Sequence, residues 1–454
     1  MEKTIAAIAT GNSAGGIGVI RISGDCALEI ADRVFKAKDG TSLLNLQGYR
    51  AKFGNIIYNN EKADDAVALV FRAPKSYTGE NVVELSVHGG IFIVEKTLEA
   101  VFEAGAQPAE AGEFTKRAFL NGKMDLTQAE SVADLISAQG EAAAKASFNA
   151  LQGSLSNKIN SVLDDLKDCS ALMAAWVDYP DEEIPELKED SLKETLEKAK
   201  ADLQSLIDNY DNGQAMLQGI DTVIAGKPNA GKSTLMNALV GKNKSIVTQI
   251  AGTTRDIVEE TVRLGSLVLH LSDTAGIRES DDLVESIGIE RAFEKIETAA
   301  LVIAVFDSSQ PLTKEDFDLI EKANGKKAVA VINKTDLNNV IDESVIKNSF
   351  EQVVYISAKN NEGVSELESA VKQVLNINDF DASAPILANQ RQKNCVKAAL
   401  DDINEALFAA NSGLTYDAIN VMIDSGIDSL LSLTGKKASI EVVNNIFSKF
   451  CVGK

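Results

Sequence analysis

The period of the hydrophobic positions changes along the chain and divides it into parts of different structure. Near the beginning, short β-branched runs at 18–22, 66–71 and 82–86 alternate with glycines and two helical stretches. This mixture predicts an α+β domain over residues 1–118. From residue 126 to about 214, apolar residues instead recur every three or four positions, which predicts amphipathic helices.

The helical pattern is clearest in one apolar stripe, formed by Leu151, Leu155, Ile159, Leu163 and Leu166. An acidic segment with two prolines at 178–185 interrupts the helices, and another helix is expected at about 191–211. Residues 388–450 are helical again, with one apolar face made of Leu400, Ile403, Leu407 and Ala410. Between the two helical parts, strand and helix patterns alternate over 216–376, the length of one doubly wound domain.

Helices on both sides of a compact α/β segment predict a helical bundle into which that segment is inserted. The predicted bounds are 119–215 for the first part of the bundle, 216–376 for the inserted domain and 377–454 for the second part.

The inserted segment carries a complete phosphate-binding loop, because residues 226–233 read GKPNAGKS. A buried-strand run precedes the loop at 221–225 and a helix start follows it at 234–240, as this motif requires. In such a loop the Lys232 side chain reaches the β- and γ-phosphates, a catalytic role, and the Ser233 hydroxyl binds Mg²⁺. The predicted nucleotide contacts here are Asn229, Ala230, Gly231, Lys232, Ser233 and Thr234.

Two later motifs indicate which base is bound. An N-K-x-D motif formed by Asn333, Lys334 and Asp336 follows the apolar run 328–332, and the strand 353–356 leads to Ser357, Ala358 and Lys359. An aspartate carboxylate can accept hydrogen bonds from guanine N1–H and its exocyclic amine, whereas adenine would leave it unpaired. The predicted nucleotide is therefore GTP.

Two further segments match the switches of a Ras-like GTPase. The predicted switch I contacts are Thr248, Gln249, Ile250, Ala251, Gly252, Thr253 and Thr254, with Thr254 completing the Mg²⁺ shell. The predicted switch II contacts are Asp273, Thr274, Ala275 and Gly276, whose aspartate holds Mg²⁺ through water and whose glycine senses the γ-phosphate. The predicted fold is thus α/β and α+β multidomain, a Ras-like P-loop G domain inserted into a helical bundle and preceded by an α+β domain.

Catalysis must differ from that of Ras. Ile277 stands where Ras-type enzymes carry the glutamine that orients the attacking water, and an isoleucine cannot do this. Asn229 and the Gly-Thr-Thr switch resemble GTPases in which K⁺ replaces an arginine finger, with Asn229, Thr248, Ile250 and Thr253 around the ion. Arg255 and Arg278 are the alternative as arginine fingers.

The composition of the chain limits which partners, location and metal sites it can have. The hydrophobic fraction is 45% and the formal net charge is −22, which argues against extensive contact with phosphate backbones. No run of about 18 apolar residues or signal-peptide pattern appears, so a soluble, cytoplasmic protein without membrane contact is expected. The four cysteines lack C-x-x-C spacing and the chain has two histidines, which argues against a structural zinc site.

From Thr4 to Lys454 the chain resembles the MnmE (TrmE) family of tRNA-modification GTPases. Outside the G domain the resemblance lies in TIAAIAT at 4–10, YTGE at 77–80, GEFTKRAFLNGKMDL at 112–126 and CVGK at 451–454. Small departures are Asn12 and Ser13 where prolines are frequent, and Val452 in the last motif. The resemblance makes Glu285 the residue that positions the attacking water.

The resemblance also implies that the first domain binds a folate and forms a constitutive homodimer. The folate contacts fall on Arg21, Glu84, Lys123 and Lys454, and the implied cofactor is 5,10-methylenetetrahydrofolate, with 5-formyltetrahydrofolate as an analogue. Cys451 is the family's cysteine near the folate. A reactive thiol whose pKa nearby cations lower and an inert, half-buried one both remain open for it.

The implied function is modification of the wobble uridine (U34) of certain tRNAs with a flavin- and NADH-using partner resembling MnmG. No G-x-G-x-x-G fingerprint appears in this chain, which assigns the FAD and NADH chemistry to that partner. An alternative from another class is a regulatory GTPase switch in ribosome assembly or RNA folding. That alternative explains residues 216–376 equally well but leaves the motifs outside them unexplained.

Overall fold

The computed structural model describes residues 3–11, 13–178, 189–242, 260–271, 295–377 and 381–454. Contacts between residues group the chain into two compact units. The first unit comprises Met1–Ala133, Ser156–Ala199 and Ala398–Lys454, and the second comprises Asp134–Leu155 and Lys200–Lys397.

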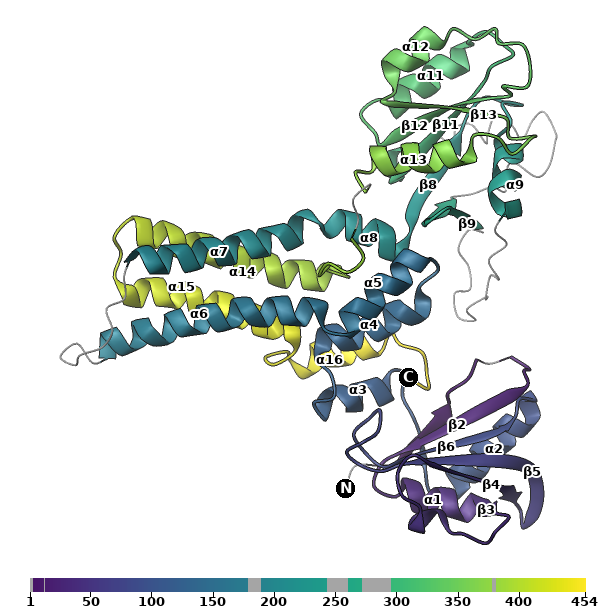
Figure 1. Cartoon of the computed structure of the whole chain (residues 1–454), viewed down its shortest axis with the longest axis vertical. Helices are drawn as coiled ribbons and strands as arrows, with labels where there is room; N and C mark the ends of the chain where they lie inside the picture. The colour runs from purple at the N-terminus through teal and green to yellow at the C-terminus, as the bar shows by residue number, and fades with distance from the viewer. Residues whose placement is uncertain (1–2, 12, 179–188, 243–259, 272–294, 378–380) are drawn as a thin grey trace. The chain divides into compact units, whose positions relative to one another are not determined.

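The first unit contains a mixed sheet whose seven described strands follow the order β3-β4-β5-β6-β2-β1-β7. The strands are β1 (Ile5–Ile8), β2 (Ile17–Ser23), β3 (Phe35–Ala37), β4 (Arg50–Tyr58), β5 (Glu61–Phe71), β6 (Val82–His88) and β7 (Gln107–Pro108). Helices α1 (Ala27–Val34) and α2 (Ile91–Glu103) cover one face, as Figure 1 shows, and a short 3-10 helix spans Leu43–Asn45. Alternate strand residues such as Ile20 and Leu85 are fully buried under these helices.

The helices that follow are α3 (Glu113–Leu120), α4 (Leu126–Ser137), α5 (Glu141–Leu151), α6 (Ser154–Asp178), α7 (Glu189–Asp208), α8 (Tyr210–Gln218), α14 (Gln390–Asn411), α15 (Tyr416–Thr434) and α16 (Ile440–Phe447). Within the first unit, α6 and α15 pack with α7 as far as Ala199 and with α14 from Ala398 onward, as a bundle (Figure 1). Lys198 of α7 pairs with Asp165 of α6, and Ser170 of α6 bonds Asp424 of α15. Helices distant in sequence therefore form one bundle.

The predicted apolar stripes are buried where these helices pack together. Leu155, Ile159, Leu163 and Leu166 of α6 are at most 2% exposed, and the four predicted residues of α14 are also buried. Leu151 does not belong to the same helix as the rest of its stripe. It ends α5, and Gly153, with φ at 93°, separates it from α6, because a left-handed residue cannot continue a right-handed helix.

The second unit contains an α/β sheet with the strand order β13-β12-β11-β8-β10-β9 among the described residues. Its elements are β8 (Ile220–Ala225), α9 (Lys232–Lys242), β9 (Glu260–Leu264), β10 (Leu267–Leu271), β11 (Leu301–Asp307), α11 (Lys314–Ala323), β12 (Ala328–Asn333), α12 (Glu343–Ser349), β13 (Gln352–Ile356) and α13 (Val364–Val374). The strands run parallel except β9, which pairs antiparallel to β10. One hydrophobic core lies on each face, as a doubly wound fold requires.

This sheet places the sequence motifs at the carboxyl ends of its parallel strands. The phosphate-binding loop follows β8, and the N-K-x-D motif begins on the last residue of β12. Ser357, Ala358 and Lys359 follow β13 directly. Ligands of open α/β sheets bind at this edge. None of the described helices has the length and apolarity needed to cross a membrane.

Candidate functional site

The phosphate-binding loop has the backbone that its sequence predicts. A Cβ on Gly226 would lie 2.4 Å from the Val305 carbonyl oxygen, so only glycine fits there. Gly231 adopts φ of 98°, and a Cβ on it would lie 2.1 Å from Asn333 Nδ2. Asn229 takes a left-handed conformation with φ of 59°, which asparagine tolerates better than most residues. The loop is therefore built by close packing against β11 and β12.

Asn333 joins the three motifs of the nucleotide site. Its side chain is buried, and its Nδ2 donates to the Ala230 carbonyl oxygen across 2.9 Å. Its Oδ1 accepts from the Ala358 backbone N–H across 3.1 Å. One amide thus holds the phosphate-binding loop on one side and the loop after β13 on the other.

Asp336 is oriented by the third motif. The Ser357 hydroxyl, fully buried, donates to Asp336 Oδ1 across 2.8 Å. The Thr335 N–H donates to the Ile356 carbonyl and so fixes the backbone beside it. Ser357 uses one acceptor site of this carboxylate, and the sites that remain on its two oxygens suit the two guanine donors.

Lys232 lies folded over its own loop. Its Nζ donates to the carbonyl oxygens of Gly226 and Lys227 across 2.7 and 2.8 Å. These carbonyls hold the ammonium within the loop, where it can bind the phosphate oxygens of a nucleotide. Binding of a phosphate would exchange neutral acceptors for charged ones, which form stronger hydrogen bonds.

A buried ion pair under the loop was not predicted. Lys227 Nζ lies 2.8 Å from Asp316 Oδ2, and the two side chains are 5% and 1% exposed. The same carboxylate oxygen caps α11 by accepting from the N–H and hydroxyl of Thr313. The Thr-x-x-Asp spacing at 313–316 is a capping signal that the sequence offers, but nothing in it indicates the pairing with Lys227.

Several predicted site residues lie outside the described part of the chain. They are Thr248, Gln249, Ile250, Ala251, Gly252, Thr253, Thr254, Asp273, Thr274, Ala275, Gly276 and Glu285, together with Arg255, Ile277 and Arg278.

The first unit brings together part of the predicted folate site. Arg21 on β2 faces Glu84 on β6 in register, and Arg21 Nε lies 2.9 Å from Glu84 Oε1. The guanidinium lies 5.6 Å from the ring centroids of both Tyr77 and Phe114, two residues that the sequence did not single out. Burial raises the pKa of Tyr77, whose hydroxyl shares a hydrogen bond with Thr115.

The segment 451–454 runs along this site. Val452 forms an antiparallel bridge with Ala111, and the Phe114 N–H donates to the Lys454 carbonyl across 3.2 Å. Arg21 Nη1 donates to the Gly453 carbonyl across 3.3 Å. Gly453 has φ of 97°, and a Cβ on it would lie 2.2 Å from the Ile8 carbonyl oxygen, so the segment lies this close only with glycine there.

The other two predicted residues lie at the margin of the same site. Cys451 is exposed, and its carbonyl accepts from the Gly112 N–H. Lys123 Nζ donates to the Pro74 carbonyl across 3.1 Å and therefore contacts the loop that carries Tyr77.

A polar network connects this loop to α3. Arg117, whose side chain is 9% exposed, bonds Glu80, Glu113 and the Lys3 carbonyl. Glu80 also accepts from the Ser23 hydroxyl, and Ser23 shares a second hydrogen bond with Thr78. The motifs at 77–80 and 112–126 are thus two halves of one network, which explains why these polar residues can be buried.

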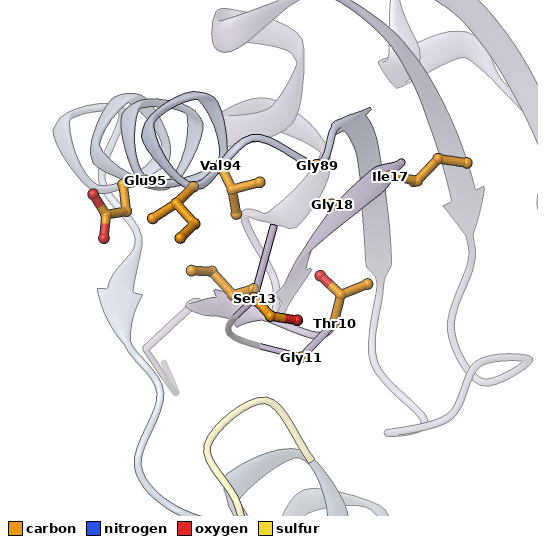
Figure 2. Close-up of a pocket in the computed structure, with 10 residues that line it drawn as sticks. Thr10, Gly11, Ser13, Ile17, Gly18, Gly89, Val94 and Glu95 are labelled. Atoms are coloured by element: carbon orange, nitrogen blue, oxygen red, sulfur yellow. The ribbon is translucent and has the colours of Figure 1, made fainter. Parts of the chain in front are cut away.

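A small cavity lies elsewhere on the same sheet, between β2, α2 and the glycine-containing loop after β1 (Figure 2). It measures about 20 Å³ and is lined in part by Thr10, Gly18, Gly89 and Val94. That is room for one water molecule, so neither a nucleotide nor a folate fits there.

Residues 4–123 match the family model described as GTP-binding protein TrmE N-terminus, and residues 126–451 match the model described as MnmE helical domain. The curated protein "tRNA modification GTPase MnmE" of Clostridioides difficile (strain 630) is 39% identical over 457 residues, which covers 100% of both chains. The protein of the same name from Alkaliphilus metalliredigens (strain QYMF) is 39% identical over 459 residues, again covering 100% of both.

Among solved structures, the G domain of the T. maritima FeoB iron transporter is 27% identical and covers 34% of this chain and 98% of its own, with a TM-score of 0.25. Aquifex aeolicus Era Y63A bound to GDP and AlF4⁻ is 26% identical and covers 40% of this chain and 66% of its own, with a TM-score of 0.26. Both TM-scores are low, and no inference follows from these two likenesses.

Proposed function

We propose, since the chain belongs to the MnmE family of tRNA modification GTPases, that it hydrolyses GTP in order to modify the wobble uridine (U34) of certain tRNAs. The modification adds an aminomethyl or carboxymethylaminomethyl group at C5. The observation that carries the proposal is the likeness to MnmE proteins over the full length of both chains, at 39% identity.

The geometry of the second unit supports GTP as the nucleotide. Asn333 connects the phosphate-binding loop to the guanine-binding motifs, and Ser357 orients Asp336. Lys232 is the proposed catalytic cation that contacts the β- and γ-phosphates of GTP. Glu285 is the proposed residue that positions the attacking water, in place of the glutamine of Ras-type enzymes. GTP hydrolysis would drive a conformational change and take no part in the carbon chemistry.

Two metal ions belong to the proposed site. Ser233 and Thr254 would hold Mg²⁺, which neutralises developing charge on the phosphates when bound. Asn229, with the backbone at Thr248, Ile250 and Thr253, would hold K⁺. Asn229 fits this role because its side chain is exposed on a left-handed residue of the loop and offers an amide oxygen.

The proposed folate site is the surface around Arg21 and Glu84. The residues present fit a folate, because a carboxylate suits the donors of a pterin edge and the flanking rings of Tyr77 and Phe114 suit its flat face. Lys123, Lys454 or Arg21 would pair with the glutamyl carboxylate. Bound 5,10-methylenetetrahydrofolate would supply the one-carbon group, and Cys451 stays a candidate for catalysis.

We assign the proposed homodimer to the sheet face opposite α1 and α2. Phe53 of β4 and Val67 of β5 are cross-strand partners on that face and are 50% and 39% exposed. Exposed apolar side chains that lie together on one face offer a surface that another chain can cover.

The proposed partner resembles MnmG and supplies the FAD and NADH chemistry. The net charge of −22 disfavours an extended phosphate-binding surface on this chain, so either a local basic patch or a basic partner protein is expected to hold the tRNA. The predicted domain bounds and the cytoplasmic location stay predictions.

Mass spectrometry of tRNA nucleosides from cells lacking the gene, with and without its restoration, tests the function. Loss of the aminomethyl-type uridines on deletion and their return on restoration are the expected results. An unchanged nucleoside profile would discard the modification role and favour a GTPase switch in ribosome assembly or RNA folding.

A further inference from the structure

A carboxylate outside the recognised GTPase motifs lies buried beside them. Asp307 ends β11, and it pairs in register with Asn333, the last residue of β12. Its side chain is 1% exposed. A buried carboxylate is costly unless hydrogen bonds and a cation compensate, so its partners indicate why it is there.

Asp307 has a full set of partners. Its Oδ2 lies 2.6 Å from Lys334 Nζ, and its Oδ1 accepts from the N–H and hydroxyl of Ser309 across 2.9 and 2.6 Å. Burial by itself would raise the pKa of Asp307, but the bonds from Lys334 and Ser309 outweigh it and hold that pKa below the usual range. The group is therefore an anion near neutral pH.

The backbone of Lys334 is also held in place. It adopts φ of 65°, and the Ser308 hydroxyl donates to its carbonyl oxygen across 2.9 Å. The Ser308 N–H donates to the Asn333 carbonyl across 2.9 Å. Ser308 therefore holds the Lys334 carbonyl, and Asp307 holds its ammonium.

The position of Lys334 in the fold shows what this arrangement can serve. It follows Asn333, which bonds the phosphate-binding loop, and precedes by two residues Asp336, which Ser357 orients. A free lysine side chain samples many rotamers, and ordering it when a ligand binds costs free energy. A carboxylate that orders it in advance reduces this cost.

We propose that Asp307 is a positioning residue for guanine-nucleotide binding, acting by fixing the Lys334 side chain beside Asp336. The inference rests on the proposed GTP site at Asn333, Lys334 and Asp336. Asp307 makes no contact with nucleotide in this proposal, and its effect falls on affinity and leaves the chemical step unchanged.

The test compares Asp307→Ala, Asp307→Asn and Lys334→Ala in the full chain by calorimetric titration with GDP and by steady-state GTP hydrolysis. We expect Asp307→Ala to raise the Kd for GDP and the KM for GTP about tenfold, equal to about 1.4 kcal/mol, with kcat within twofold of the parent. Asp307→Asn keeps an uncharged acceptor of the same shape and should recover most of the affinity. Glu343→Gln, which removes an ion pair of α12 with Lys347, is the matched control and should leave both constants unchanged.

The double variant Asp307→Ala/Lys334→Ala separates positioning from a general structural role. Since Asp307 acts through Lys334, the double variant should bind GDP as Lys334→Ala alone does. Additive losses, an unchanged affinity in Asp307→Ala, or equal losses of kcat and affinity in both Asp307 variants would overturn the inference. Asp336→Asn tests the underlying site independently, because unchanged GDP binding in that variant would remove the GTP site itself.

Discussion

Arg21 and Glu84 face each other on neighbouring strands, and the guanidinium that pairs with Glu84 also donates to the carbonyl oxygen of Gly453. The cation thus reaches a carbonyl that lies 432 positions away in the sequence. The ion pair is partly accessible, with side chains 16% and 22% exposed, so a ligand can compete for either group. The proposed folate site and the segment 451–454 are therefore linked through Arg21.

Replacing Arg21 by alanine should weaken binding of 5-formyltetrahydrofolate by roughly ten- to a hundredfold, the range expected for one charge-assisted hydrogen bond. Equilibrium dialysis of the purified chain measures this affinity. Lys62→Ala, which removes an exposed cation paired with Asp65 on β5 of the same sheet, should bind like the parent. Equal affinity in Arg21→Ala and the parent would place the folate elsewhere.

Gly453→Ala should release the segment 451–454 from the sheet, because the new Cβ would lie 2.2 Å from the Ile8 carbonyl oxygen. The Phe114 N–H, which donates to Lys454, should then exchange with deuterium at least tenfold faster. Residue-resolved hydrogen exchange measures this rate. Gly413→Ala is the control, since its φ of 70° imposes the same kind of strain with no atom within 4 Å. Unchanged exchange at Phe114 would show that the glycine is not needed for docking.

Asp336→Asn should change the base that the protein prefers. An asparagine amide presents a donor where the carboxylate accepts, so GDP should lose two charge-assisted hydrogen bonds and bind roughly a hundredfold or more weakly. Xanthosine diphosphate, with an oxygen in place of the exocyclic amine, should bind better than GDP. Competition against a fluorescent nucleotide gives both constants, and retained preference for GDP would refute the role of Asp336.

The rate of GTP hydrolysis should be higher in K⁺ than in Na⁺ at equal ionic strength, because Na⁺ is too small for the same ring of oxygens. Asn229→Ala should remove most of this difference while the protein still binds GDP. Phosphate release in matched chloride salts measures the effect. Equal rates in both salts would eliminate the K⁺ site and leave Arg255 or Arg278 as the source of positive charge.

The pKa of His88 should lie above its ordinary value. Its Nδ1 lies 2.7 Å from Asp64 Oδ1, and this hydrogen bond raises the pKa of His88 from 6.5. Because the folded pKa is the higher one, the stabilisation by this pair is complete below pH 6.5 and is lost as pH rises through the folded value. An NMR titration of the ring should show Asp64→Asn returning it to about 6.5, the ordinary value. Glu61→Gln, which removes another exposed acid of β5, is the control, and a pKa unmoved by Asp64→Asn would contradict the assignment.

The phosphate-binding loop and the two guanine motifs could be predicted because their chemistry is local in sequence. Spacing alone places the phosphate-binding loop after one parallel strand and Asn333 and Asp336 at the end of another, where the structure has them. The apolar period likewise predicted the long helices, and the fold class is confirmed by the α/β sheet and helices of the structure.

The contacts that complete the sites could not be predicted, because they join residues with no shared motif. Lys227 and Asp316 lie 89 positions apart, and neither residue type nor spacing identifies them as partners. Tyr77 comes to Arg21 from a loop and Phe114 from α3, and only the folded chain brings them together. The break between Leu151 and α6 was missed because a helical period continues across Gly153 in the sequence, while the backbone does not.

Asn333 also couples nucleotide binding to folding of the domain. Its amide bonds two loops that are complete only after β8, β11, β12 and β13 have assembled in the sheet, so the unfolded domain has no site to offer. A ligand that binds only the native state adds stability in proportion to the logarithm of its concentration, about 2.7 kcal/mol at one hundred times its Kd. In a cell with ample guanine nucleotide, the thermal resistance of this domain is thus a property of the complex, and a loss of affinity shortens the lifetime of the protein as well as slowing its reaction.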